Sequence, residues 1–182
     1  MRFHGFIVAL LFPAWIASDY SVAASFREGA PCWPDTGGDD LNRRVGFRVA
    51  LQRLPPGSVL RIATSGLYRA SVDGQFVGHG PARAGHGHFR IDEWSLDSGA
   101  GSGTSVVAIE VAASTARSFY MVKQLPFLQA EVVSDGKVLA ATPDFQAIDL
   151  HPVVVVRRVP RYSYQRTFTE VFRPTPGWSA AW

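Results

Sequence analysis

Cysteine, charged residues, helical periodicity and long apolar runs are all scarce in this chain of 182 residues. The single cysteine, Cys32, excludes an internal disulfide, so a buried core has to hold the fold together. Charged residues make up only 18% of the chain and hydrophobic residues 47%, which excludes a disordered protein and suits a globular one. No segment of ten residues has a helical period, which argues against an all-α fold.

The first 24 residues have the features of a secretory signal peptide. Arg2 and His4 give a basic start, an apolar run follows over 6–16, and small residues precede a cleavage point at Ser25. The apolar run is too short to span a bilayer, and no other segment is a candidate membrane span. An N-terminal core strand or a membrane anchor are the alternatives. The signal peptide predicts a secreted or periplasmic protein, and despite the net charge of +3 we therefore expect no nucleic-acid partner.

Turn-forming residues are abundant, with 17 glycines and 12 prolines, as an all-β protein requires. Apolar residues alternate over 44–51 and predict a strand there. Further strand patterns recur at intervals of roughly 8 to 15 residues, among them one that includes Phe89 and Ile91 and one over 119–122. Asp-Gly pairs at 73–74 and 135–136 predict tight type I′ hairpins, because both residue types tolerate positive φ. This pattern is typical of a β-sandwich or jelly roll.

The residues around the first hairpin carry a motif. Residues 67–83 read LYRASVDGQFVGHGPAR, and the pattern YxxxVDGxxVGxGPxR resembles a hairpin in the N-terminal β-sandwich of bacterial α-L-rhamnosidases. The matching positions are Tyr68, Val72, Asp73, Gly74, Val77, Gly80, Pro81 and Arg83. The resemblance extends over 47–170, although the turn at 101–104 lacks the asparagine that is usual in that family.

The resemblance implies a galactose-binding-like jelly-roll β-sandwich over 25–157. Residues 158–182 would then be a linker or the first segment of a further, missing module. Because the family's catalytic machinery lies in a helical barrel downstream, we expect a non-catalytic N-terminal accessory module of a secreted α-L-rhamnosidase-like glycoside hydrolase. Its partners would be rhamnose-containing glycans and the missing barrel of the same polypeptide. A prematurely terminated reading frame explains the length equally well.

Two other functional classes stay open from the sequence. The chain is alternatively a free-standing carbohydrate-binding module, or a structural sandwich with no affinity for sugar. The first alternative predicts an exposed aromatic platform or a loop pocket, and the second predicts an apolar surface patch that pairs with a partner.

Glycoside hydrolysis requires two carboxyl groups that flank the bond to be cleaved. The candidates are Asp39 with Asp40, Asp92 with Glu93, and Glu110. Adjacent residues of a strand point to opposite faces, so Asp92 and Glu93 are poorly placed to act on one bond. We therefore assign no catalytic residue, and we expect no cofactor.

His86 and His88 are two positions apart, so on a strand their side chains face the same way. Such a pair is compatible with a metal site, but a third ligand is needed, and only His79 or Asp92 lies near in the sequence. No metal site is assigned.

Sugar binding is the chemistry that these residue types suit best, because sugars stack on aromatic faces and are fixed by a few polar groups. The candidate substrate-binding residues are Trp33, Arg83, His86, His88 and Trp94. The competing interpretation places the aromatic residues in the core and lets Arg83 brace the loop after Pro81.

Overall fold

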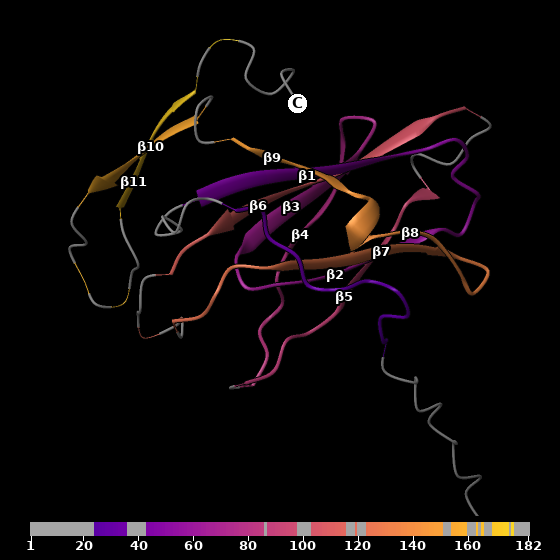
Figure 1. Cartoon of the computed structure of the whole chain (residues 1–182), viewed down its shortest axis with the longest axis horizontal. Helices are drawn as coiled ribbons and strands as arrows, with labels where there is room; N and C mark the ends of the chain where they lie inside the picture. Colours follow the sequence, from indigo (N-terminus) through magenta and orange to yellow (C-terminus); the bar gives the residue numbers. More distant parts are fainter. Residues whose placement is uncertain are drawn as a thin grey trace, which may run out of the picture.

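The computed structural model describes residues 24–35, 43–85, 87–97, 103–115, 119, 123–150, 154–159, 163, 165, 169–174 and 176. In this part of the chain, antiparallel strands form two facing sheets (Figure 1). The five-stranded sheet has the order β4 (Gln75–Gly80), β3 (Leu67–Val72), β6 (Ser105–Ala113), β1 (Arg43–Leu51) and β9 (Gln146–Asp149). The four-stranded sheet has the order β5 (Asp92–Ser95), β2 (Val59–Thr64), β7 (Leu128–Ser134) and β8 (Lys137–Ala141). A further hairpin pairs β10 (Val154–Val159) with β11 (Thr169–Pro174).

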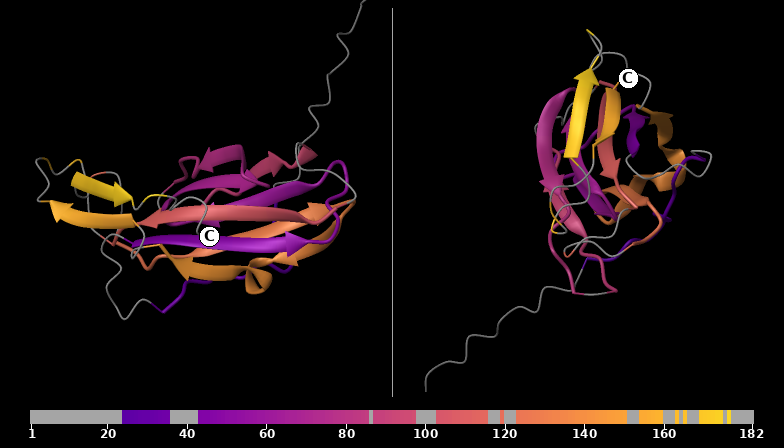
Figure 2. Two further views of the ribbon diagram at one scale, coloured as in Figure 1. Left: turned by 90° about the horizontal axis from the view of Figure 1, so that it is seen from above. Right: turned by 90° about the vertical axis from the view of Figure 1, so that its left-hand side faces the viewer.

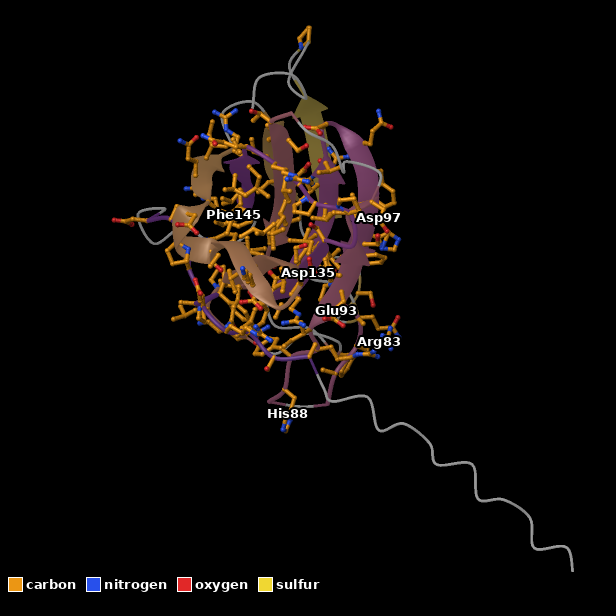
Figure 3. All side chains as sticks on the ribbon, turned by 90° about the vertical axis from the view of Figure 1, so that its right-hand side faces the viewer. Arg83, His88, Glu93, Asp97, Asp135 and Phe145 are labelled. Carbon is orange, nitrogen blue, oxygen red and sulfur yellow. The ribbon has the colours of Figure 1, made fainter. Side chains whose placement is uncertain are left out.

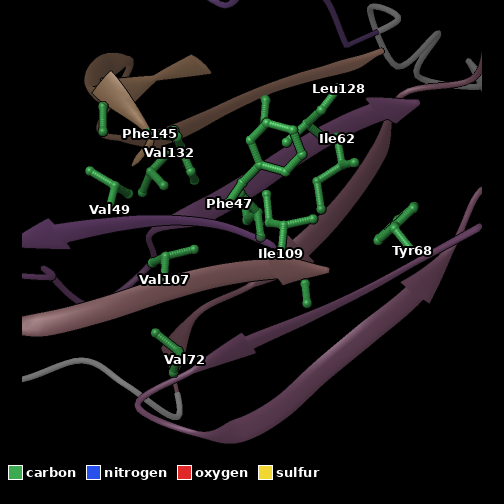
Figure 4. Packing of buried hydrophobic residues seen from close by; sticks show 14 of the residues in the cluster. Phe47, Val49, Ile62, Tyr68, Val72, Val107, Ile109, Leu128, Val132 and Phe145 are labelled. Atoms are coloured by element: carbon green, nitrogen blue, oxygen red, sulfur yellow. The ribbon is translucent and has the colours of Figure 1, made fainter. Parts of the chain in front are cut away.

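The two sheets, which form the two layers in Figure 2, enclose one apolar core. Along β1 the alternation predicted from the sequence is confirmed, since Val45, Phe47, Val49 and Leu51 are buried. Arg48 and Ala50, which lie between the last three of these, are exposed. Figure 4 shows Phe47 and Ile109 of one sheet meeting Ile62, Leu128 and Val132 of the other. Each large apolar side chain buried in this way contributes roughly 1.5–3 kcal/mol to folding. The expected all-β sandwich is therefore confirmed.

Both predicted Asp-Gly hairpins are present. Asp73 and Gly74 have φ values of 48° and 77°, and Asp135 and Gly136 have 47° and 72°, as a type I′ turn requires. The first turn is also tied to β6, because the Asp73 carboxylate accepts a hydrogen bond from the Val106 N–H at 2.7 Å. The hairpin of the sequence motif is thus fixed both by its own turn and by the strand beside it.

Some predicted elements differ from the structure. A strand was expected to include Phe89 and Ile91, but β5 begins only at Asp92, and Phe89 lies in the preceding loop. Strand β9 was not predicted, because its four residues are mostly exposed and show no apolar alternation. The 3-10 turn η2 (Thr142–Asp144) leads into it. The strand expected over 119–122 lies almost wholly outside the described residues.

The expected segment boundaries remain predictions. Of the proposed signal peptide, only Ala24 belongs to the described residues. The expected boundary at 157 lies within β10, which pairs with β11 in the segment 158–182. Among the residues that the structure describes, no helix has both the length and the apolar character needed to cross a membrane.

Residues 24–35 pack against the four-stranded sheet and are held there by Glu131 of β7 (indigo segment in Figure 1). The neighbours of Glu131 along β7 belong to the core, so its own side chain points to the outer face, yet its exposed fraction is 0%. One carboxylate oxygen accepts hydrogen bonds from the N–H groups of residues 27–29 at 2.9, 3.2 and 3.3 Å. Arg61 donates to the other oxygen at 3.2 Å. The N-terminal segment is therefore part of the folded domain.

Candidate functional site

Three connections meet at one end of the sandwich. They are the β2–β3 turn at 65–66, the β4–β5 loop at 81–91 and the end of the β6–β7 connection at 123–127. The N–H of Phe127 donates to Ser65 Oγ at 3.0 Å, which joins the first connection to the third. The rings of Phe89 and Phe127 meet edge to face with centroids 4.8 Å apart, which joins the second to the third. We call the described residues of these three connections the loop end.

The motif residues at the base of the loop end form a hydrogen-bonded network. The Tyr68 hydroxyl donates to Asp92 Oδ2 at 2.7 Å and accepts from the indole N–H of Trp94 at 2.8 Å. The same Asp92 oxygen accepts the N–H of Ala82 at 3.1 Å. Because β3 and β5 belong to different sheets, this network joins the sheets along one side and closes the loop 81–91 at its base.

The two glycines of β4 make room for this network. A Cβ atom on Gly78 would lie 2.4 Å from the Trp94 ring, and a Cβ atom on Gly80 would lie 2.4 Å from Asp92 Oδ2. The Gly80–Pro81 peptide bond that follows is cis. The spacing of glycines in the motif therefore has a packing reason, which is the close approach of an indole and a carboxylate to the backbone of an edge strand.

Burial is the main cause that raises the pKa of Tyr68 well above its ordinary value. The hydrogen bond to Asp92 and the charge of that carboxylate act in the same direction, while the bond from Trp94 opposes them. The hydroxyl therefore stays protonated and remains a donor to Asp92 at neutral pH.

Removing that hydroxyl tests the network. We expect Tyr68→Phe to lower the free energy of unfolding by about 2 kcal/mol, because it leaves a partly buried indole N–H and a carboxylate oxygen each short of one partner. Urea denaturation of the variant measures this loss. Arg53→Gln, an exposed change in the loop after β1, serves as the control and is expected to leave stability unchanged. Equal stability of Tyr68→Phe and the wild-type protein would contradict a stabilising role for the network.

The candidate sugar-binding residues fall into two groups. Arg83 and His88 are exposed on the loop 81–91 (Figure 3), while His86, on the same loop, lies outside the described residues. Trp33 and Trp94 are partly buried and pack against the core, and the Trp33 ring lies 5.9 Å from that of Phe47. The loop thus brings Arg83 and His88 into one site and leaves the two tryptophans outside it. Their roles in sugar binding stay predictions.

Phe89 is an additional candidate that the residue types alone did not single out. Its side chain is 48% exposed, although its ring is held edge to face by Phe127. The sequence assigned it to a strand, where it would have been a core residue. The signal that was available is its position within GHGHFR, in which glycines flank both histidines and disfavour a regular strand.

The candidate catalytic carboxylates each have partners. Glu93 pairs with Arg61 at 2.8 Å, and Asp92 is bound by Tyr68 and Ala82. Glu110, with a side chain only 3% exposed, pairs with Arg69 at 2.7 Å and also with Arg44 of β1. Asp39 and Asp40 lie outside the described residues. Within the described part of the chain, no three His, Cys, Asp or Glu residues gather as a metal site would require.

The fold and its loop end define a class of protein, an all-β sandwich module with a cationic, partly aromatic end. No known family profile and no curated protein sequence matches the chain. Among solved structures, the chain is similar to a GH78 family rhamnosidase of Bacillus sp. GL1, with a TM-score of 0.71 and 23% identity over 82% of this chain and 16% of that one. An α-L-rhamnosidase from Dictyoglumus thermophilum has a TM-score of 0.45 and 15% identity over 69% of this chain and 16% of its own.

The first of these similarities confirms the expected resemblance at the level of the fold. The sandwich has the architecture of one part of the GH78 rhamnosidase, and the chain spans only 16% of the length of that protein.

Proposed function

We propose that this chain is a non-catalytic accessory module of a secreted or periplasmic α-L-rhamnosidase-like glycoside hydrolase that acts on rhamnose-containing glycans. One observation carries the proposal. The fold of 82% of this chain matches only 16% of the GH78 rhamnosidase, so the chain corresponds to one module of a much longer hydrolase. The partner of this module is then the catalytic barrel of the same polypeptide.

The state of the carboxylates supports a non-catalytic role. A retaining or inverting glycosidase needs one carboxyl group that stays protonated and a second one that faces it across the substrate. Glu93 and Glu110 are instead each paired with an arginine side chain, so neither carboxylate is left to face a second one across a substrate. Asp92 is occupied in holding Tyr68 and the base of the loop.

The first test reads the coding sequence beyond the Trp182 codon. We expect an in-frame continuation of several hundred codons with helical periodicity and paired acids. A stop codon directly after Trp182 would contradict the role as a module of a larger enzyme.

A second test measures hydrolysis by the purified chain. We expect no release of p-nitrophenol from p-nitrophenyl α-L-rhamnoside above the uncatalysed rate. Turnover that survives repurification would overturn the non-catalytic role.

The loop end favours one alternative, a carbohydrate-binding module that acts without an attached barrel. Arg83, His88 and Phe89 are exposed together on the loop 81–91, and a cation beside an exposed aromatic ring suits a sugar. Retention of rhamnose-containing glycans on an array by the purified chain, combined with a stop codon after Trp182, would favour this alternative.

A further inference from the structure

Acidic residues are absent from the loop end. Two segments of the sequence, 74–91 and 111–130, contain no aspartate or glutamate. The arginines and lysines of these segments are Arg83, Arg90, Arg117 and Lys123. The loop 81–91 and the connection 123–127, which form most of the loop end, both lie within these two segments.

The opposite end of the sandwich carries acidic residues in its turns. Strands β3, β5 and β7 all begin at the loop end, and each leads into a turn that contains an aspartate at the other end. These residues are Asp73, Asp97 and Asp135. Figure 3 shows Asp97 well away from His88 on the projecting loop. This opposite end also carries Arg53 and Lys137, so its charges are mixed, whereas the charged residues of the loop 81–91 and the connection 123–127 are all cationic.

The loop 81–91 has a closed shape that places its cations on both sides. The N–H of Ala82 donates to the Asp92 side chain and closes the base, and the N–H of His88 donates to the Gly85 carbonyl at 3.0 Å and forms a turn at the tip. Arg83 directly follows Ala82 in the sequence, and Arg90 precedes Asp92 by two positions. Both residues are exposed, so each of the two arms of this short loop carries an exposed arginine.

An aromatic ring lies between these cations in the sequence. The Phe89 side chain is 48% exposed and is supported edge to face by Phe127. A ring that is held from one side and open on the other is suited to stack against the apolar face of a pyranose. The two carboxylates that follow the loop have partners of their own, because Asp92 is bound by Tyr68 and Glu93 by Arg61.

We propose that the loop end binds a carboxylate-bearing saccharide, a glycan that contains uronic acid. Arg83 and Arg90 would receive the carboxylate, because a guanidinium matches a carboxylate with two parallel hydrogen bonds, and Phe89 would stack against a sugar ring. This inference rests on the proposed function, which makes a glycan the ligand. It adds that this glycan carries carboxylate groups.

The number of cations favours a short acidic saccharide over a nucleic acid. Duplex DNA carries one charge per about 1.7 Å of axis, and proteins that bind it commonly make about 6–10 phosphate contacts. The loop 81–91 and the connection 123–127 supply Arg83, Arg90 and Lys123 among their described residues. Three cations are too few for such a duplex contact. A small number of cations beside one aromatic ring suits an acidic saccharide, in which sugar rings separate the carboxylates.

Calorimetric titration tests the inference with a matched pair of ligands, trigalacturonic acid and its fully methyl-esterified form. The two saccharides differ only at their carboxyl groups, which are ionised in the acid and are neutral methyl esters in the other form. We expect the wild-type protein to bind the acid at least about tenfold more tightly than the ester, because the ester loses the charge-assisted hydrogen bonds. We also expect this affinity to fall as salt is raised, because exposed charges are screened.

Two variants locate the site. Arg83→Gln combined with Arg90→Gln is expected to weaken binding of the acid by about tenfold or more, since both changes remove charge from one exposed loop. Arg53→Gln removes one such charge at the opposite end of the sandwich, in the loop between β1 and β2, and is expected to bind like the wild-type protein. A thermal melt of each variant confirms that the fold is intact.

Several outcomes would overturn the inference. Equal affinity for the acid and the ester excludes a carboxylate-specific site, and equal weakening by Arg53→Gln excludes the loop end as its location. Tighter binding to duplex DNA than to trigalacturonic acid at the same salt, lost in the double variant, would identify a phosphate-binding surface instead. Binding of a neutral rhamnose-bearing disaccharide but not of the acid would refute this inference alone and leave the proposed function standing. The coding sequence beyond Trp182 tests that function separately.

Discussion

Replacing Glu131 with alanine is expected to lower the free energy of unfolding by about 4 kcal/mol, within the range for breaking a buried charged network. The carboxylate is completely buried and accepts hydrogen bonds from three consecutive backbone N–H groups at 27–29. Without it, these donors and one hydrogen bond of Arg61 lose their acceptor in a site closed to water. Chemical denaturation measured at neutral pH gives the loss directly.

The matched control for this change is Glu93→Gln. Glu93 pairs with the same Arg61 from the other side, but its side chain is 45% exposed, so the pair contributes less than about 1 kcal/mol. Both variants remove a negative charge near Arg61. The larger loss in free energy of unfolding expected for Glu131→Ala is therefore the part that comes from the buried carboxylate. Equal losses in both variants would show that the hydrogen bonds to residues 27–29 do not stabilise the domain.

The same carboxylate predicts an acid dependence. Burial acts to raise the pKa of Glu131, but the hydrogen bonds from residues 27–29 and from Arg61 outweigh it and hold the pKa below the ordinary value of 4.5. A group whose pKa is lower in the folded state stabilises that state at pH values above its unfolded pKa. This contribution is therefore complete at neutral pH and is lost as the pH falls below about 4.5 toward the lower folded pKa. The Glu131→Gln variant should show a weaker dependence over that range.

Substituting Gly78 with alanine is the second change with a large expected effect. The new Cβ would lie 2.4 Å from ring atoms of Trp94, so either β4 or the indole has to move. The indole packs against the core and donates its N–H to Tyr68, and moving it would strain both contacts. We expect a loss of about 3 kcal/mol, the upper end of the usual cost of overpacking, measured as a lower midpoint in urea.

Gly85→Ala is the control for the glycine substitution. Gly85 is exposed in the loop 81–91, and a Cβ atom there would meet nothing within 4 Å. Its stability is expected to stay within about 1 kcal/mol of the wild-type protein, since only the entropy of the unfolded chain changes. Similar losses in Gly78→Ala and Gly85→Ala would mean that the contact with Trp94 does not require a glycine.

The candidate site was only partly accessible from the sequence. Arg83 and His88 are on one exposed loop, as their proximity in the chain suggests, but Trp33 and Trp94 pack against the core. A tryptophan looks the same in a sequence whether it forms a platform for sugar or fills a gap beside a glycine. The sequence predicts a strand at Phe89, because an aromatic residue two positions before the β-branched Ile91 is typical of strands. The conformation of the loop 81–91 is instead fixed at its base by the hydrogen bond from the Ala82 N–H to the Asp92 carboxylate.

The sequence by itself determined the features that depend on neighbouring residues. The alternation along β1 selects which side chains face the core, and the two Asp-Gly pairs select their turns, because both depend on local backbone geometry. Only the tertiary structure decided that Glu131 anchors the N-terminal segment and that Phe127 brings the connection 123–127 against the loop 81–91. The partners of Glu131 at residues 27–29 lie 102 to 104 positions away in the chain. Contacts over such distances follow from how the N-terminal segment packs on the outer face of the four-stranded sheet, which no local preference specifies.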